Sequence, residues 1–373
     1  MNWRYRRLPL LSIILLPFFL VACNDSPPGP PPPPNGPDTT SHNFIFEIDT
    51  LGDASSLLYD TAIISENNIW AVGDFYLRDS TGQVDPLRYN VAQWDGSQWE
   101  VKRITVMFRG NPVTPPLEGI STFSATDIWL VGSLPIHGDG QTWTIFDLRA
   151  MPGFETVSVS KAWGTSPSDM YFVGANGSIV HYNGATWQAM QSGTTLPLLD
   201  VFGRSATEVY AVGGDRSTAV VLKYDGTRWA TLMNSYYFGN GFDSTELFRT
   251  QLYGHLNGAW VDESGTLYVV GEYVYQMKAG QWGFTPGIAD NYLNAPIFSR
   301  GFLTSIRGEA GNDFVTAGER LTVIHHNGSS GIQVGPQFSF ASPIDFYGVD
   351  MKGPFIVGVG TSGGRAIAVR LHR

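Results

Sequence analysis

A short apolar segment that ends in glycine recurs seven times in this chain, and this repeat limits the possible folds more than any other feature. It reads Asn68-Ile69-Trp70-Ala71-Val72-Gly73 in the first copy and Asp127-Ile128-Trp129-Leu130-Val131-Gly132 in the second. The seven glycines are Gly73, Gly132, Gly174, Gly213, Gly271, Gly318 and Gly358. Most of the glycines are separated by about 40 to 50 residues, which is the length of a four-stranded propeller blade. The repeat therefore predicts an all-β fold, a seven-bladed β-propeller.

Each repeat contains further strands around that segment. A strand of small residues precedes it, as in Val201-Phe202-Gly203. A third strand follows it, and then a turn and a tryptophan, as in Asp95-Gly96-Ser97-Gln98-Trp99. Asp-Gly between such strands favours a type I′ hairpin turn, which needs positive φ at both central residues. We expect the repeated Trp and Tyr side chains to pack between blades, because each buries a large apolar area.

The two ends of the repeat region complement each other. The last copy ends with a third strand, residues 365–373, and lacks a fourth, whereas residues 43–49 form an extra strand before the first copy. We predict that residues 43–49 supply the outer strand of the last blade, which closes the ring and removes two open sheet edges. The propeller domain is thus expected over residues 43–373.

Residues 1–22 have the pattern of a signal peptide. Arg4, Arg6 and Arg7 precede an apolar stretch, residues 8–21, that two prolines interrupt. The stretch ends in Leu20-Val21-Ala22-Cys23, which resembles the lipobox of bacterial lipoproteins. That resemblance implies cleavage before Cys23 and acylation of its thiol. An ordinary secretory signal with an incidental cysteine is the alternative.

A proline-rich linker follows the cysteine and extends the expected tether over residues 23–42. Prolines dominate residues 27–37, and because each fixes its backbone angle and lacks an amide donor, the run forms neither helix nor sheet. Such a spacer spans roughly 35 Å. Together with the lipobox it predicts a propeller anchored in the bacterial cell envelope. Asn24 after the cysteine favours the outer membrane, by resemblance to Gram-negative lipoproteins.

The repeat unit also resembles a known group of proteins. Its pattern of Ser-x-x-Asp-Ile-Tyr-Ala-Val-Gly followed by Ile-x-His-Tyr-Asp-Gly-x-x-Trp is similar to tandem repeats of secreted bacterial β-propellers. At the level of repeat shape it is similar to the Asp-box superfamily of sialidase, sortilin and photosystem-assembly propellers. In this sequence Asp and Gly are adjacent before the Trp, as in Asp225-Gly226-Thr227-Arg228-Trp229, whereas the Asp-box separates them by one residue. The resemblance places no catalytic residue on a numbered position.

Composition excludes several classes of function. The 373 residues carry a formal net charge of -10, and an acidic surface repels a polyphosphate backbone, so nucleic acid is not an expected partner. Cys23 is the only cysteine, which rules out an intrachain disulfide and a cysteine-based zinc site. His325 and His326 are consecutive in a strand and point to opposite sheet faces, so they do not chelate one metal. We assign no catalytic residue, no metal and no cofactor.

Loop lengths indicate which face of the propeller binds. Strands alternate in direction, so loops from second to third strands and from one blade to the next share one face. All long insertions fall in that set: residues 74–89, 103–116, 231–254 and 284–301. Long loops on a rigid scaffold are where binding sites usually lie. The candidate ligand-binding residues are Asp74, Tyr76, Arg78, Tyr236, Tyr237, Asp243, Asp290 and Tyr292.

Two functions fit these loops. The aromatic and polar side chains can be hot spots for a protein partner, which predicts a non-enzymatic binding or assembly scaffold held at the membrane by its lipid. They can also stack on sugars, and a glycan-binding or glycan-cleaving, sialidase-like propeller is the alternative. Equally, these aromatic residues can serve only to anchor their own loops. A redox or cofactor propeller is a weaker third hypothesis.

Overall fold

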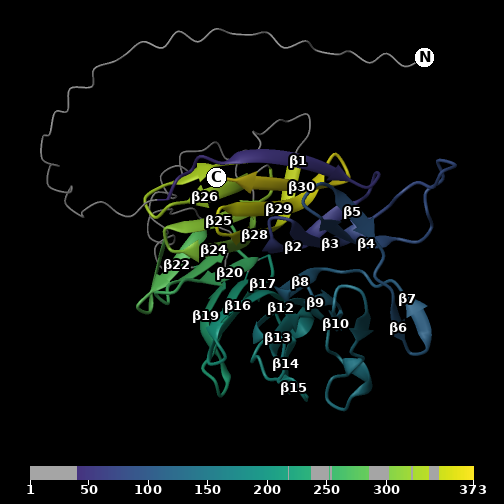
Figure 1. Ribbon diagram of the computed structural model, residues 1–373. Coiled ribbons are helices and arrows are strands. Elements are labelled where there is room, and N and C mark those ends of the chain that lie inside the picture. Colours follow the sequence, from purple (N-terminus) through teal and green to yellow (C-terminus); the bar gives the residue numbers. More distant parts are fainter. Residues whose placement is uncertain are drawn as a thin grey trace, which may run out of the picture. The chain divides into compact units, whose positions relative to one another are not determined.

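The repeated segment forms the second strand of each four-stranded sheet in the computed structural model, which describes residues 40–216, 218–236, 252, 254–284, 302–320, 322–335 and 344–373 (Figure 1). Seven four-stranded antiparallel sheets are present, which confirms the predicted all-β propeller of seven blades. Three helical residues in a row, in each of two 3-10 turns, are the longest helical segments in the described part of the chain. None of its helices is long and apolar enough to cross a membrane.

Six blades consist of four consecutive strands. Blades 1 to 3 contain β2 (Leu57–Ser65), β3 (Asn68–Phe75), β4 (Tyr89–Trp94) and β5 (Trp99–Lys102); β8 (Gly119–Ser124), β9 (Asp127–Gly132), β10 (Leu134–Gly138) and β11 (Trp143–Ile145); and β12 (Val159–Ser166), β13 (Asp169–Gly174), β14 (Ile179–Tyr182) and β15 (Trp187–Met190). Blades 4 to 6 contain β16 (Leu198–Ser205), β17 (Glu208–Gly214), β18 (Thr218–Tyr224) and β19 (Trp229–Tyr236); β20 (Gly258–Val261), β21 (Leu267–Val270), β22 (Val274–Lys278) and β23 (Gln281–Phe284); and β24 (Leu303–Ala310), β25 (Asp313–Gly318), β26 (Thr322–His326) and β27 (Gly331–Gln333).

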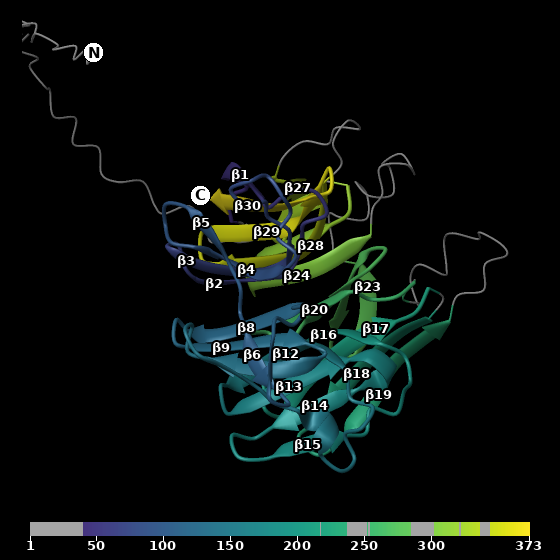
Figure 2. The same ribbon diagram turned by 90° about the vertical axis from the view of Figure 1, so that its right-hand side faces the viewer.

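The seventh blade joins the two ends of the propeller. It contains β28 (Ile344–Lys352), β29 (Phe355–Ser362) and β30 (Arg365–His372), and its outer strand is β1 (Ile45–Leu51) from the start of the domain. Figures 1 and 2 both show β1 (purple) beside β30 (yellow), and the two strands pair in antiparallel register over the whole of β1. The predicted closure is confirmed, with the strand placed two residues later than expected.

Side chains from two blades hold the closing strand. Arg370 of β30 contacts Glu47 at 2.6 Å and Asp49 at 3.0 Å, both in β1. Its guanidinium lies 3.6 Å from the ring centroid of Trp94 in blade 1. Trp99, also in blade 1, donates a hydrogen bond from Nε1 to Asp49 at 3.0 Å. The joint is therefore fixed by polar contacts as well as by the strand pairing.

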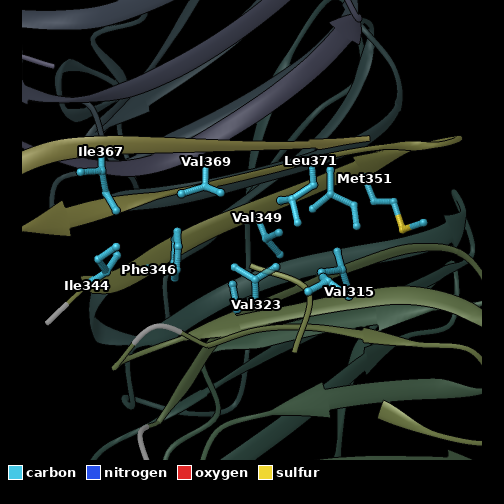
Figure 3. Packing of buried hydrophobic residues seen from close by; sticks show 12 residues of the cluster. Val315, Val323, Ile344, Phe346, Val349, Met351, Ile367, Val369 and Leu371 are labelled. Carbon is cyan, nitrogen blue, oxygen red and sulfur yellow. The ribbon is translucent and has the colours of Figure 1, made fainter. Parts of the chain in front are cut away.

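The core lies between neighbouring blades. The first strands contact each other in succession around the ring, from β2 through β8, β12, β16, β20, β24 and β28 and back to β2. Figure 3 shows the packing of blade 6 on blade 7, where Val315 and Val323 lie against Phe346, Val349 and the apolar side chains of β30. Burial of each such side chain contributes about 1.5 to 3 kcal/mol. Trp residues pack between blades as predicted, for example Trp143 on Trp70, with ring centroids 5.9 Å apart.

The repeat glycines leave room for the first strand. A Cβ on Gly73 would lie 2.1 Å from the carbonyl oxygen of Leu57, so no larger residue fits there. In blade 7 the equivalent residue is Gly360, whose Cβ would lie 1.9 Å from the carbonyl oxygen of Asp345. A Cβ on Gly358 would meet only side-chain atoms, at 3.2 Å or more. The sequence alignment of the seventh repeat was therefore wrong by two residues, although the blade count is unaffected.

The hairpin turns differ from the expected type in most blades. Asp95 has no positive φ, whereas Gly96 does. The loop between β4 and β5 is four residues long because the Asp95 carboxylate accepts hydrogen bonds from the amides of Ser97 and Gln98. The same pattern recurs at Asp139, Asn183, Asp225 and Asn327. Among the described turns between third and fourth strands, only the shortened fifth copy, Ala279-Gly280, combines a two-residue loop with positive φ at both positions, as a type I′ turn requires.

We call the two sides of the ring the turn face, which carries these hairpin turns, and the insertion face, which carries the long loops. Residues 103–116, expected as a loop, include a small hairpin of β6 (Val106–Phe108) and β7 (Asn111–Val113) (Figure 1). The expected loop 231–254 is shorter, because β19 continues to Tyr236. The strand ends on either side of the insertions before β4, β8, β20 and β24 all lie on the insertion face.

Candidate functional site

A cavity of about 430 Å³ opens on the insertion face at the axis of the ring. Every blade contributes to its wall, and its lining residues are Tyr59, Glu118, Ser160, Lys161, Leu199, Asn257, Thr304 and Tyr347. We call this cavity the axial mouth. The rings of Tyr59 and Tyr347, from blades 1 and 7, lie 6.2 Å apart at a tilt of 43°.

Backbone bulges place these side chains in the mouth. In five blades the first strand skips one residue in its pairing with the second strand, and the skipped residues are Tyr59, Ser160, Leu199, Thr304 and Tyr347. A bulge re-aims the side chain that it carries. In the other two blades Glu118 and Asn257 directly precede the first strand, and their amides donate to Val131 and Val270.

Sequence reasoning missed these residues, although a signal was present. In six blades the mouth residue lies 14 positions before the repeat glycine. The pairs are Tyr59 and Gly73, Glu118 and Gly132, Ser160 and Gly174, Leu199 and Gly213, Asn257 and Gly271, and Thr304 and Gly318. At this fixed offset the residue type varies from blade to blade, which is unlike the repeated positions that pack between blades.

Charged side chains beneath the mouth join blades that are not neighbours. Lys161 of blade 3 reaches Asp60 of blade 1 at 2.7 Å, past blade 2. Arg307 of blade 6 reaches Asp200 of blade 4 at 3.0 Å, past blade 5. Asp60 also accepts the amide of Ile120 in blade 2. These buried carboxylates are satisfied by cations and amides, so they act first as connections around the ring.

A second cavity, of about 330 Å³, lies at the turn-face end of the axis. Asp60, Arg307 and Asp350 are among its lining residues. Asp350 accepts the amide of Ile63 at 2.7 Å, but no ion pair to it occurs in the described part of the chain. Desolvation by burial raises the pKa of Asp350 to about 6, against the opposing effect of its amide hydrogen bonds and of Arg307.

Three ionisable groups of the axial mouth have raised pKa values, and burial is the first cause in each. Burial raises the pKa of Glu118, and Asp74 raises it further, while Lys161 acts in the opposite direction. Burial also raises the pKa of Tyr59, with added contributions from Asp74 and Glu118. For Tyr347 the pKa is raised by burial and then by the carboxylates of Asp345 and Glu319. Burial is the main cause of each shift, nearby carboxylates add to it, and for Glu118 the cation Lys161 opposes it more strongly than Asp74 supports it.

Three of the residues predicted to bind ligands lie at the end of β3 and in the loop after it. Asp74 pairs with Arg88 at 2.9 Å and is close enough to Tyr59 and Glu118 to raise the pKa of both. Tyr76 is held by its backbone, because its amide donates to the Ser56 hydroxyl. Arg78 contacts Asp53 at 3.6 Å and the carbonyl of Gly82 at 2.8 Å, so its visible role is to fix the loop.

The remaining predicted residues receive little or no description. Tyr236 is the last residue of β19, where only its backbone is described. The other ligand-binding candidates lie outside the described residues; they are Tyr237, Asp243, Asp290 and Tyr292. The predicted lipidation site, Cys23, also lies outside them. Phe75, which the sequence suggested for the loop, is instead fully buried at the end of β3.

The histidines have structural partners. His181 contacts Asp169 at 2.7 Å, and His325 contacts Asp313 at 2.8 Å, so in both blades a third-strand histidine bonds the first residue of the second strand. His137 makes the same contact, to Asp127 at 2.7 Å, rather than to Asp139 in the nearby turn. Within the described ranges no group of three or more His, Cys, Asp or Glu residues could hold a metal ion.

Apolar side chains are exposed on the insertion loops of blades 1 to 3. Leu87 and Met107 are 62% and 63% exposed, and Val84 and Met151 also face solvent. We call these four residues the insertion surface. Ion pairs brace the loops that carry them: Arg103 contacts Asp85 at 2.5 Å, and Arg109 contacts Asp147 at 2.6 Å. The loops are thus held in place before any partner arrives.

Comparisons with known proteins give a fold and no family. No protein-family model matches the chain, and the comparison with curated proteins finds no match. Among solved structures, YCF48 bound to a D1 peptide has a TM-score of 0.59 at 16% identity, over 88% of this chain and 95% of that one. The WD40 propeller domain of Doa1 has a TM-score of 0.57 at 12% identity, over 87% and 95%.

A third solved structure is that of an enzyme. A catalytically inactive variant of virginiamycin B lyase from Staphylococcus aureus, determined with quinupristin, has a TM-score of 0.55 at 10% identity, over 89% of this chain and 100% of that one. Identities this low establish the fold alone. Because this architecture carries both peptide binding and lyase chemistry, the function must be argued from the site. The chain is similar to β-propellers in fold, and its function has to be inferred from its own residues.

Proposed function

We propose that this chain is a lipid-anchored protein of the bacterial envelope that binds a protein partner through the insertion face. One observation carries the proposal: exposed apolar side chains lie on insertion-face loops that ion pairs brace. Exposed apolar groups on fixed loops favour association, because their burial removes apolar area from water without a large ordering cost. The structural likeness to YCF48 bound to a peptide is consistent with this use of the fold.

Two substitutions at the insertion surface test the partner. We expect Leu87→Asp and Met107→Asp to abolish a cross-linked partner in membranes that contain the full-length protein, because a carboxylate at an interface core is costly to desolvate. Ile332→Asp, at a similarly exposed apolar residue in β27, is the matched control. An unchanged cross-linking pattern in both insertion-surface variants would contradict the proposal.

A separate substitution tests the anchor. The lipobox-like sequence that ends at Cys23 supports acylation of that thiol, and the prolines after it support a spacer between the lipid and the propeller. We expect Cys23→Ser to abolish metabolic incorporation of a labelled fatty acid and to release the propeller from the membrane fraction. Retention of the label in this variant would disprove lipidation at Cys23.

Glycan binding is the second candidate function. The paired rings of Tyr59 and Tyr347 at the axial mouth favour it, since tyrosine offers a stacking face and a hydroxyl to a sugar. Binding of an oligosaccharide panel, measured by calorimetry with the wild type and with Tyr347→Ala, tests it. Saturable binding that the substitution abolishes would support a glycan site.

A further inference from the structure

We propose that the axial mouth receives a basic side chain, lysine or arginine, presented by the protein partner. The identity of the partner rests on the proposed function, whereas the chemistry of the bound group rests on the mouth itself. The insertion surface would supply apolar contact area, and the mouth would supply the specificity for one cationic group.

The mouth has room for one long side chain. Its volume of about 430 Å³ lies within the range of small-ligand pockets, and Tyr59 and Tyr347 form one part of the wall. An ammonium or guanidinium group over a tyrosine ring is attracted by the negative face of the ring, and the attraction increases when water is excluded. The apolar stem of lysine or arginine can contact Leu199 on the wall.

The charges around the mouth favour a cation. Among the described residues two cations at or near the mouth are already paired: Lys161, which is part of its wall, with Asp60, and Arg88 with Asp74. Glu118 has no ion pair and no hydrogen-bond donor to its carboxylate among the residues that the structure describes. An anionic ligand would meet this carboxylate, and a neutral ligand would leave it without a partner. Glu118 is exposed in the free protein. A basic side chain would pair with its carboxylate and would displace part of the water around it, which strengthens the pair.

The acid–base properties of the mouth agree with this geometry. Burial raises the pKa of Glu118, Lys161 lowers it in part and Asp74 raises it, so the charged form is less favoured than in water. A bound cation would lower that pKa again. The affinity should therefore be constant above the pKa of free Glu118 and should fall as the pH drops below it, because protonated Glu118 offers no charge to the ligand.

Short peptides test the inference directly. We would titrate the wild-type protein with the capped tripeptides acetyl-Gly-Lys-Gly amide, acetyl-Gly-Arg-Gly amide and acetyl-Gly-Gln-Gly amide, following the tyrosine ring resonances by NMR. We expect the lysine and arginine peptides to bind about fivefold or more tightly than the glutamine peptide. We also expect their binding to shift the resonances of Tyr59 and Tyr347 and to weaken at acidic pH.

Variants separate the mouth from general electrostatics. Glu118→Gln should remove the preference for the basic peptides, and Tyr59→Leu should weaken it, whereas Tyr59→Phe should keep it. Glu66→Gln is the matched control, because it removes one negative charge from the turn face, between β2 and β3. Thermal melting of each variant verifies that it is folded. The Tyr59→Leu and Tyr59→Phe pair keeps the test valid even if Glu118→Gln fails to fold.

The results distinguish this inference from the proposed function. Equal binding of all three peptides, or equal loss in Glu118→Gln and Glu66→Gln, would overturn the basic side-chain site. Cross-linking of a partner through Leu87 and Met107 would then still support a protein-binding insertion face. Conversely, specific binding of the basic peptides without any partner that depends on Leu87 or Met107 would support the mouth and contradict the proposed function.

Discussion

At the turn face the recurring polar side chains form hydrogen bonds within their own turns and strands. At the axial mouth of the insertion face, several polar groups form no hydrogen bond or ion pair with the described part of the chain. Asp225, for example, accepts the amides of Thr227 and Arg228, and His181 contacts Asp169. Glu118 has no comparable contact within the described ranges. The two faces are built from the same strands, so the difference comes from the side chains that each blade carries at its two ends.

This difference teaches where function can be sought in a repeat protein. A polar residue that recurs at one place in every blade is explained by the blade, because the same local contact is made each time. The mouth residues share a backbone position and differ in side chain, from Leu199 to Glu118. A variable side chain on a repeated scaffold position is free to serve a ligand.

The largest effect is expected where the bulge of the first strand is formed. Gly360→Ala places a Cβ 1.9 Å from the carbonyl oxygen of Asp345, so the backbone at the mouth must shift, at a cost of about 2 to 3 kcal/mol. Gly358→Ala meets only movable side chains and should cost less. Urea unfolding measures both free energies, with Gly283→Ala, which meets nothing within 4 Å, as the control. A larger loss of unfolding free energy for Gly358→Ala than for Gly360→Ala would show that the close approach of the first strand is not the reason for the repeat glycine.

Acidic pH should lower the free energy of unfolding through a buried histidine near the turn face. His326 is buried, stacks on Phe314 and contacts Thr316 at 2.9 Å. Burial, and then His325 and His42, lower its pKa to about 3. Folded His326 stays neutral while the unfolded histidine takes up a proton below about pH 6.5, so the free energy of unfolding falls as the pH drops from 6.5 toward 3. The contribution of His326 to this loss should reach about 2 kcal/mol at about pH 5, while Asp350, whose pKa burial raises to about 6, acts in the opposite direction.

The pH dependence can be assigned with one variant. His326→Asn should be less stable than the wild type at about pH 7.5, because the ring stacking is lost, but its stability should decline less between about pH 6.5 and 5. The slope that remains combines two opposite contributions. His42 and His255, whose pKa values burial also lowers, reduce the stability in acid, whereas Asp350, whose pKa burial raises to about 6, increases it. Urea midpoints across this range are the measurement, and parallel pH profiles for the two proteins would exclude His326 as a source.

A smaller effect separates the two faces. Asp225→Ala removes two hydrogen bonds to the turn between β18 and β19 and should lower the free energy of unfolding by about 1 kcal/mol. Binding of the lysine and arginine tripeptides should not change, because the turn lies on the opposite face from the axial mouth. A loss of peptide binding in this variant would show that the faces are coupled.

The smallest effect on stability is expected at the mouth. Since burial raises the pKa of Glu118, the folded protein at neutral pH bears a carboxylate that would be better solvated in the unfolded chain. Glu118→Gln should therefore leave the free energy of unfolding unchanged or slightly raised, while the preference for basic peptides disappears. A clear loss of stability would identify Glu118 as a structural residue instead.

Particular residues show how far the sequence could be interpreted. The Ile-Trp-Ala-Val-Gly segment and its relatives predicted the correct number of blades, and the missing fourth strand after residues 365–373 led to the correct partner for β1. Phe75 was wrongly included in the insertion expected over residues 74–89. It is the buried last residue of β3, and the sequence does not mark where the strand ends and the loop begins. Tyr59 and Glu118 were not predicted, because they lie in or beside a first strand and loop length does not mark such positions.

The sequence by itself determined the blade, its repetition and the closure of the ring, because period, turn residues and unpaired strand edges are local properties that repetition makes visible. The tertiary structure alone decided which side chains meet at the axis. Tyr59 and Tyr347 are neighbours only because the ring brings blade 7 back to blade 1. Lys161 pairs with Asp60 for the same reason, since the contact crosses an intervening blade. Contacts of this kind depend on the curvature of the whole ring, which no single repeat encodes.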